Sequence, residues 1–180
     1  MVSDKKRCTW VTGDPLAIKY HDDEYGKPLD GDDELFERLS LEIFQAGLNW
    51  RMVLRKREAL RKAFKNFSIG RVASFTEKDV VRLMEDKGII RNKLKINATI
   101  ENAKRLKKVV AEYGSFANYI STIDAGQKDV HKAFKRQFVF IGPKIVESFL
   151  QSIGKLPQIH EPDCWKARTR RKTRLDKTVR

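Results

Sequence analysis

The 180-residue chain predicts an all-α protein, and three observations support that prediction. All five prolines lie at positions 15, 28, 143, 157 and 162, so residues 29–142 contain no residue that lacks a backbone N–H. Apolar residues within that stretch recur at helical spacing, and the alternation typical of strands is absent. The short apolar run VFIG at 139–142 is flanked by Lys and Arg and followed by a helical pattern, so we expect no strand there.

The first long helix is expected over residues 32–46, DDELFERLSLEIFQA. Two apolar sets recur at helical spacing, one forming a face and the other its flank: Leu35, Phe36, Leu39, Ile43 and Ala46, then Leu41, Phe44 and Leu48. Such a helix is covered on most sides. Glu42 lies at the edge of the main face, where it meets little bulk water, so its carboxylate needs a partner.

Three further helices follow before position 114. We expect them over residues 50–67, over residues 76–85, where Thr76 and Asp79 have the spacing of a capping box, and over residues 92–113. Several glycines follow these periodic segments, where a left-handed residue commonly ends a helix: Gly47, Gly70, Gly88, Gly114, Gly126 and Gly142.

Size and charge limit the possible functions. A chain of 180 residues can build one compact core, or two small lobes that share a cleft. Its 38 Lys and Arg exceed its 24 Asp and Glu, and the formal charge of +14 suits nucleic acid first and an anionic membrane second. About half of that charge lies in the tail 166–180, KARTRRKTRLDKTVR, which also has the composition of a solvated flexible segment.

No apolar run approaches the roughly 18 residues that span a bilayer. The N-terminus MVSDKKRCTW lacks the apolar core of a signal peptide, so we expect a cytoplasmic protein. Its two cysteines, Cys8 and Cys164, are too few for a disulfide framework and are expected to stay reduced.

A cysteine and a histidine stand near each end of the chain, Cys8 with His21 and His160 with Cys164. Two sulfurs and two imidazoles satisfy tetrahedral Zn²⁺, and a four-ligand site of this kind is structural because it leaves no open position. It would join the two termini. Because the pairs are far apart in sequence, four unrelated side chains are the plainer interpretation of the spacing alone.

Residues 137–154, QFVFIGPKIVESFLQSIG, predict two helices joined by a tight turn at Gly142 and Pro143. Free backbone N–H groups at the start of the second helix, with Lys144 beside them, suit a DNA phosphate and do not depend on base identity. Gly-Pro before a helix is also an ordinary helix-start signal, which is the plainer interpretation.

Four aromatic residues surround Glu42 in the sequence: Trp10, Tyr20, Tyr25 and Trp50. Aromatic residues at such spacings also build ordinary cores. In a basic chain with a half-buried carboxylate, they favour a pocket in which flat rings stack on a nucleobase. The carboxylate would accept the N–H protons of that base or offset its positive charge.

Five stretches of the chain resemble the DNA-3-methyladenine glycosylase I family, and together they cover most of it in the family's order. They are RCTWVTGDPLAIKYHDDEYG at 7–26, LFERLSLEIFQAGLNWRMVLRKREALRKAFKNF at 35–67, GIIRNKLKINATIENA at 88–103, FVFIGPKIVESFLQSIG at 138–154 and HEPDC at 160–164. The resemblance implies a helix-hairpin-helix glycosylase fold in which zinc joins the N- and C-terminal segments. It also implies an enzyme that flips an alkylated base from double-stranded DNA and hydrolyses its N-glycosidic bond.

By position, the resemblance implies roles for individual residues. Cys8, His21, His160 and Cys164 match the zinc ligands, Glu42 matches the carboxylate that contacts the base, and Tyr20 and Trp50 match pocket aromatics, to which we add Trp10. Leu48 matches the residue that wedges into the duplex, and Gly142 and Lys144 lie in the hairpin that holds phosphate. Because 3-methyladenine is cationic and leaves readily, the enzyme must select and hold it rather than protonate it. No clear lysine nucleophile is present, so we expect a monofunctional enzyme.

The chain also departs from the family pattern. Ala17 stands where a second pocket tyrosine is expected, Tyr25 where a tryptophan is expected, and Asn49 where a serine is expected. The segment 115–135 is shorter than in better-known members. These differences predict a roomier or less selective pocket, or a different grip on DNA.

We expect a single glycosylase unit over residues 1–165, with two helical lobes around a cleft, acting as a monomer and followed by the basic tail 166–180. One alternative is a non-catalytic zinc-stapled relative that binds damaged or distorted DNA and tolerates changes at Glu42. Another is a basic helical RNA-binding or scaffolding protein, which predicts neither zinc nor a preference for damaged DNA.

Overall fold

The computed structural model describes residues 5–11, 13–124 and 130–167, and this part of the chain contains helices and no strand. The all-α prediction is therefore confirmed, including the expected lack of a strand at 139–142. The elements before residue 64 are η1 (Thr9–Val11), α1 (Pro15–Lys19), the π-helix η2 (Tyr20–Glu24), α2 (Asp32–Gln45) and α3 (Trp50–Ala63). The later elements are η3 (Lys65–Phe67), α4 (Ile69–Ala73), α5 (Glu77–Glu85), α6 (Lys93–Tyr113), α7 (Phe116–Thr122), α8 (Val130–Gln137) and α9 (Pro143–Ser152).

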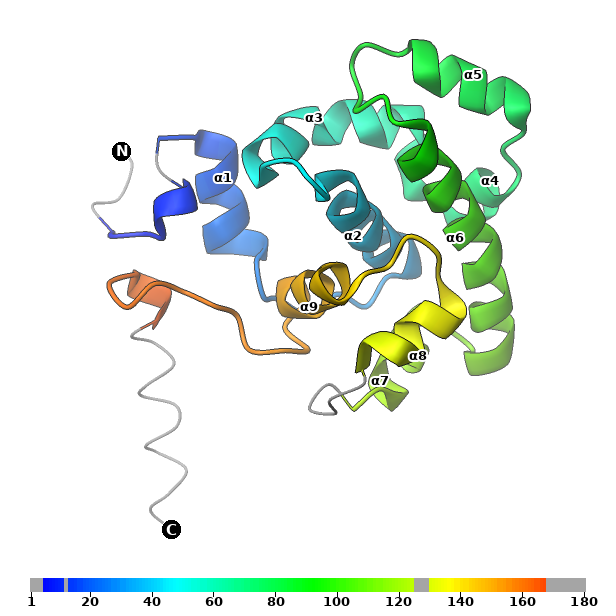
Figure 1. Ribbon diagram of the computed structural model, residues 1–180. Coiled ribbons are helices and arrows are strands. Elements are labelled where there is room, and N and C mark those ends of the chain that lie inside the picture. The colour runs from blue at the N-terminus through cyan, green and yellow to red at the C-terminus, as the bar shows by residue number, and fades with distance from the viewer. Residues whose placement is uncertain (1–4, 12, 125–129, 168–180) are drawn as a thin grey trace.

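Helix α2 lies at the centre of the molecule, with α9 against it (Figure 1). It also packs against α3, α6 and α7, and its residues 35–44 are all buried. The predicted cover on most sides of this helix is thus confirmed. Its burial includes three charged residues, Glu37, Arg38 and Glu42, so α2 places ionisable groups inside the protein.

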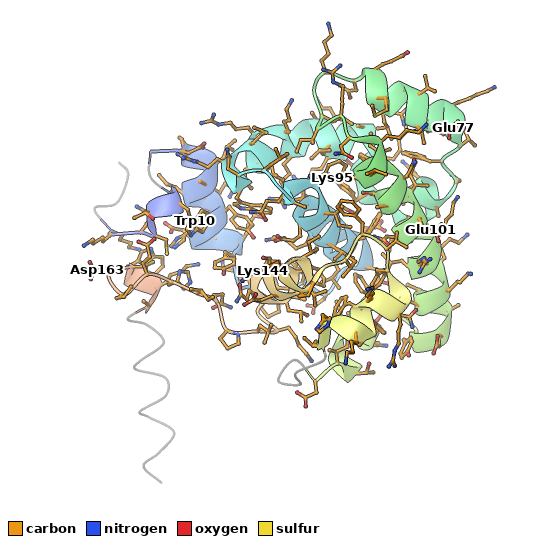
Figure 2. The ribbon with its side chains drawn as sticks, in the orientation of Figure 1. Trp10, Glu77, Lys95, Glu101, Lys144 and Asp163 are labelled. Atoms are coloured by element: carbon orange, nitrogen blue, oxygen red, sulfur yellow. The ribbon has the colours of Figure 1, made fainter. Side chains whose placement is uncertain are left out.

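The C-terminal end of α2 is held by α6. The buried Lys95, near the start of α6, donates from Nζ to the carbonyl oxygens of Phe44 at 2.8 Å and Ala46 at 2.5 Å (Figure 2). The last carbonyls of a helix have no partner within the helix, and a cation there also complements the helix dipole. Gly47 then turns the chain with a φ of +76°, which fixes the turn that carries Leu48.

Side chains at the helix starts satisfy backbone N–H groups that the helices leave free. Asn49 Oδ1 accepts from the backbone N of Met52 at 2.8 Å, so the residue that replaces the family's serine is the cap of α3. The predicted capping box of Thr76 and Asp79 is present at the start of α5. Asn92 caps α6, so the predicted boundaries of α5 and α6 are confirmed.

The helix expected over residues 50–67 is wrong in its last turn. Helix α3 ends at Ala63, and residues 65, 66 and 67 have positive φ values of 53°, 55° and 52°. This left-handed turn sends both Phe64 and Phe67 into the core, where their stacked rings lie 5.5 Å apart. Burial of two phenylalanines favours the turn over the continued helix that their spacing predicts.

The glycine predictions are partly confirmed. Gly47 and Gly114 end helices with φ values of +76° and +83°. Gly70 lies inside α4, Gly88 does not adopt a positive φ, and Gly142 is the N-cap of α9 with a φ of −91°, so the expectation is wrong at these three. Gly126 lies outside the described residues.

The turn between α8 and α9 has the predicted helix–turn–helix order. Asn102 of α6, fully buried, pins it by accepting from the backbone N of Val139 at 2.8 Å and donating to its carbonyl at 3.1 Å. The next residue, Phe140, adopts a positive φ of 57° and is 41% exposed. Pro143 then begins α9 at a position where a missing N–H costs nothing.

None of the helices that the structure describes is long and apolar enough to cross a membrane. The predicted basic tail lies almost wholly outside the described residues, which end at residue 167.

Candidate functional site

The Cys/His pairs from the two ends of the chain come together, as predicted. One ligand atom from each of Cys8, His21, His160 and Cys164 lies within 4.8 Å of all the others, so the cluster could hold a metal ion. Cys8 Sγ is 3.5 Å from His160 Nδ1, and Cys164 Sγ is 3.4 Å from His21 Nε2. Two sulfurs and two ring nitrogens are a donor set suited to tetrahedral zinc.

The surroundings of His21 match those of a metal ligand. Its ring is fully buried, and its Nδ1 lies 2.7 Å from Asp22 Oδ1, so Nε2 is the nitrogen that faces the cluster. A carboxylate on the far nitrogen is the usual partner of a ligating histidine. Burial lowers the pKa of His21 and so favours the neutral imidazole that binds metal.

Hydrogen bonds outside the cluster also join the two ends. The backbone N of Trp165 donates to the carbonyl of Lys6 at 2.9 Å, and Thr9 Oγ1 donates to Glu161 Oε1 at 2.7 Å. Lys6 and Asp163 form an ion pair at 2.6 Å. In Figure 2, the label of Asp163 shows where the C-terminal segment lies beside the N-terminal segment. The N-terminal segment therefore has a defined position although its helices are short.

A pocket of about 300 Å³ opens between these joined ends and the central helices. The residues that line it are Trp10, Tyr20, Tyr25, Glu42, Gln45, Trp50, Ser148 and Gln151. Every residue predicted to contact a base is among them, namely Glu42, Tyr20, Trp50 and Trp10. Tyr25 lines the pocket, whereas Ala17 is fully buried and does not.

The aromatic side chains form a continuous wall. The rings of Tyr20 and Trp50 lie 4.9 Å apart, and Trp10 meets Tyr20 and Tyr25 edge-on at 6.3 Å and 6.2 Å. Trp50 Nε1 is buried and has no hydrogen-bond partner among the described residues. Such a donor is costly unless a ligand or water satisfies it, so the wall offers both flat faces and a free N–H.

Glu42 is the one carboxylate in this pocket lining. Its side chain is 5% exposed, and no described residue donates a hydrogen bond to it. Burial raises its pKa to about 8, an effect that the positive charge of Arg38 opposes. The partner expected for this carboxylate is thus a charge one helical turn away, and the carboxylate oxygens are left for a ligand.

Arg38, which is 3% exposed, was not among the site residues predicted from the sequence. Its Nη2 donates to Glu24 Oε2 at 3.2 Å, and its guanidinium lies 4.9 Å from the centre of the Tyr20 ring. A usable signal was present, because Arg38 precedes Glu42 by four residues and must share its helix face.

Three polar pocket residues were also not predicted. Gln45 lies one residue beyond the apolar run of α2, and Ser148 and Gln151 are three residues apart on α9, so they share a face. The spacing of the last two was visible in the sequence. Nothing there indicated that this face of α9 meets the pocket.

The residues predicted to contact DNA lie outside the pocket lining. Leu48 is 36% exposed in the turn between α2 and α3. Lys144 lies in the first turn of α9, with its side chain 91% exposed and paired with Glu147 at 3.0 Å. Figure 2 shows Lys144 at α9 and Trp10 on the N-terminal segment.

The described part of the fold is helical, and its aromatic pocket contains a buried carboxylate. A family model described as methyladenine glycosylase matches residues 10–137. The DNA-3-methyladenine glycosylase 1 of Escherichia coli K12 is 40% identical, over 83% of this chain and 90% of the relative. The DNA-3-methyladenine glycosylase of Haemophilus influenzae is 36% identical, over 88% and 96%.

A solved structure of 3-methyladenine DNA glycosylase I from Staphylococcus aureus, which addresses the recognition of 3-methyladenine, superimposes with a TM-score of 0.80. It is 31% identical, and the alignment covers 91% of this chain and 97% of that one. The chain belongs to the methyladenine glycosylase family.

The raised pKa of Glu42 predicts that Glu42→Gln stabilises the protein at alkaline pH. The folded protein keeps this proton up to pH of about 8, whereas the unfolded chain loses it near the ordinary value of 4.5. Stability is therefore lost as pH rises through that interval, and the amide abolishes the loss. In urea unfolding, we expect a gain on the order of 1–4 kcal/mol at about pH 8 that shrinks toward pH 5.

The matched control is Glu77→Gln, because Glu77 is 73% exposed on α5 (Figure 2). It should show no such pH-dependent gain. A Glu42→Gln protein whose stability relative to wild type stays constant with pH would contradict the buried, protonated state of this carboxyl.

Proposed function

We infer that the protein is a DNA-3-methyladenine glycosylase of base-excision repair, which hydrolyses the N-glycosidic bond between 3-methyladenine and deoxyribose. Family membership and the named relatives support this activity. The observation that supports it most directly is the position of Glu42, a buried carboxylate that accepts no hydrogen bond from the described residues, in a pocket walled by aromatic rings. A flat cationic base suits both features.

Glu42 is proposed to recognise the base by accepting hydrogen bonds from its edge and by balancing its positive charge. The entry of a cation lowers the pKa of a nearby carboxylate, so binding of the base and ionisation of Glu42 favour each other. A neutral adenine would leave the buried carboxyl protonated and without a complementary charge. Selection of the damaged base thus follows from the same burial that raises the pKa of Glu42.

Tyr20 and Trp50, with Trp10 beside them, are proposed to stack on the flipped base. Their ring spacings leave the pocket bounded by aromatic faces and edges. Methylation at N3 already makes adenine a good leaving group. The enzyme then needs to hold the base while positive charge develops on the sugar and water attacks. No lysine is among the described residues that line this pocket, which favours simple hydrolysis over strand cleavage.

The turn between α8 and α9 is proposed to grip double-stranded DNA as a helix-hairpin-helix element. Gly142 and Lys144 would contact a phosphate, since the N-cap of α9 makes no side-chain capping hydrogen bond and the lysine is exposed. Leu48 would wedge into the duplex from the turn that Lys95 fixes. Both segments are held by buried side chains of α6, which suits surfaces that must deform DNA.

Cys8, His21, His160 and Cys164 are proposed to bind one structural Zn²⁺ that joins the ends of the chain. Their donor set and mutual distances support zinc, and the ion would add a strong cross-link where the segments are short. We propose that residues 1–165 act as a single unit, since Trp10 and Gln151, near the two ends of that range, line the same pocket. We also propose that the protein acts as a monomer. A less selective pocket as a result of Tyr25 remains a prediction.

Glu42→Gln should reduce release of 3-methyladenine from methylated duplex DNA about 100-fold or more, as loss of a preorganised charge does elsewhere. The measurement is single-turnover release of free base, with identification of each base released. Glu77→Gln, far from the pocket on α5, should release base at the wild-type rate. Tight DNA binding by the wild type without release of any base would favour the non-catalytic DNA-binding alternative.

Protein purified without chelator should contain one zinc per chain, and Cys164→Ser should lose most of that zinc and melt at a lower temperature. His131→Ala is the matched control, because His131 lies on α8 and outside the cluster. Metal analysis and thermal unfolding measure both effects. Less than about half an equivalent of zinc or another tetrahedral metal in the wild type would refute the metal site.

Lys144→Ala should weaken binding to undamaged duplex DNA and reduce the slope of log affinity against log salt by about one, as loss of one phosphate contact does. Lys78→Ala is the control, since Lys78 is exposed on α5. Equal slopes for wild type and Lys144→Ala would argue against the phosphate contact.

A further inference from the structure

Arg38 is a buried cation next to the aromatic pocket, and it has no role in the function proposed for that pocket. Arg38 is 3% exposed, its Nη2 reaches Glu24 Oε2 at 3.2 Å, and its buried Nη1 has no hydrogen-bond partner among the described residues. Burial of a guanidinium with an unsatisfied N–H is costly. A purely structural position would favour an apolar side chain of similar size, so the charge itself needs an explanation.

The position of Arg38 connects it to Glu42 and to the aromatic wall. Glu42 follows Arg38 by four residues on α2, so both side chains project from the same face one turn apart. The guanidinium lies 4.9 Å from the centre of the Tyr20 ring, and Tyr20 and Glu42 both line the pocket. Arg38 thus lies close behind two groups proposed to contact the base.

A network of ion pairs fixes Arg38 on its far side. Glu24 Oε2 also accepts from Arg57 Nη1 at 2.6 Å, and Arg57 and Arg61 both pair with Glu37 Oε1, at 2.6 Å and 2.9 Å. Ion pairs with Arg38 and Arg57 therefore fix the position of the Glu24 carboxylate. The negative charge of Glu24 also limits the repulsion between Arg38 and a cationic base.

The other groups that face Glu42 carry no competing charge. Among the residues that line the pocket, the remaining ionisable groups are the phenols of Tyr20 and Tyr25, and burial raises the pKa of Tyr20 well above neutral pH. Helix α9 contributes Ser148 and Gln151, and α3 contributes Trp50, which do not titrate. Arg38 is therefore the nearby charge that can oppose the desolvation of Glu42 before the base enters.

We propose that Arg38 is a positioning residue for base recognition, whose guanidinium, held by Glu24 behind Tyr20, favours the charged form of the Glu42 carboxylate that a cationic base requires. The proposal rests on the function proposed above for Glu42. Removal of the cation should raise the pKa of Glu42 above its already raised value of about 8. Base release should then fall most at low pH and recover as pH rises, because activity needs the ionised carboxylate.

The test uses two neutral variants, Arg38→Met and Arg38→Gln, with Arg38→Lys to restore the charge. Carbon-13 NMR of glutamate-labelled free enzyme follows the Glu42 carboxyl, which is assigned by its absence in Glu42→Gln. Both neutral variants should move its titration midpoint, and the acidic limb of the pH profile for 3-methyladenine release, upward by about 1–3 pH units. Arg38→Lys should return both close to wild type.

Arg61→Met is the matched control, because it removes a cation from the same network that does not contact Tyr20. It should leave the Glu42 midpoint unchanged. An unshifted midpoint in the neutral Arg38 variants, or an equal loss of activity at every pH, would overturn the proposal in favour of a structural role. Failure of both neutral variants to fold, judged by far-UV circular dichroism, would also assign Arg38 a structural role.

The two readouts separate this proposal from the proposed function. If wild-type protein releases no 3-methyladenine, the function proposed for the pocket fails. The NMR midpoint still decides independently whether Arg38 favours the charged form of Glu42, because it is measured without substrate.

Discussion

The junction between the two ends of the chain is the constraint on which the pocket depends. Trp10, Tyr20 and Tyr25 come from a segment whose helices, η1, α1 and η2, are too short to hold a position by their own packing. The C-terminal segment supplies the missing contacts through Trp165, which bonds to Lys6, and through the Cys/His cluster. Without this junction, α2, α3 and α9 would present Glu42 and Trp50 on an open surface. The cluster lies beside the pocket wall, since the rings of His21 and Trp10, and those of His160 and Tyr25, are each 5.5 Å apart. The proposed zinc would therefore help to fix that wall.

Helix α2 carries Glu42 in this pocket, and burial disfavours the ionised form of its carboxyl group. A core residue chosen for stability would be apolar here, so the free energy lost at Glu42 indicates a functional requirement. In the proposed function, a ligand that brings positive charge offsets this free-energy cost when it binds. The guanidinium of Arg38 and the network through Glu24 and Arg57 limit the cost without filling the pocket. In the proposed function, the same few charges would affect both the stability of the fold and the selection of the base.

The sequence predicts most of this architecture where the determinants are local. Apolar periodicity and capping residues locate α2, α5 and α6 closely, and the types of residue near each end indicate the metal donors. Prediction fails where distant packing decides, as at Phe64 and Phe67, where core burial outweighs helix continuation. It fails in the same way at the pocket, because Gln45, Ser148 and Gln151 become lining residues only when α9 packs on α2. Arg38 was missed because a charged residue on a helix is ordinarily solvated.

Helix α9 carries residues for both parts of the proposed function, which are contact with a DNA phosphate and recognition of the base. Lys144 lies in its first turn, on the side proposed to hold phosphate, and Ser148 and Gln151 lie in its next turns as part of the pocket wall. At about 1.5 Å per residue, a four-residue step places the pocket wall only about 6 Å along the axis from the phosphate contact. Because α9 packs on the buried helix α2, which carries Glu42, these groups cannot shift independently. In the proposed complex, contact with the DNA backbone would therefore set the distance between the flipped nucleotide and the Glu42 carboxylate, whatever the base may be.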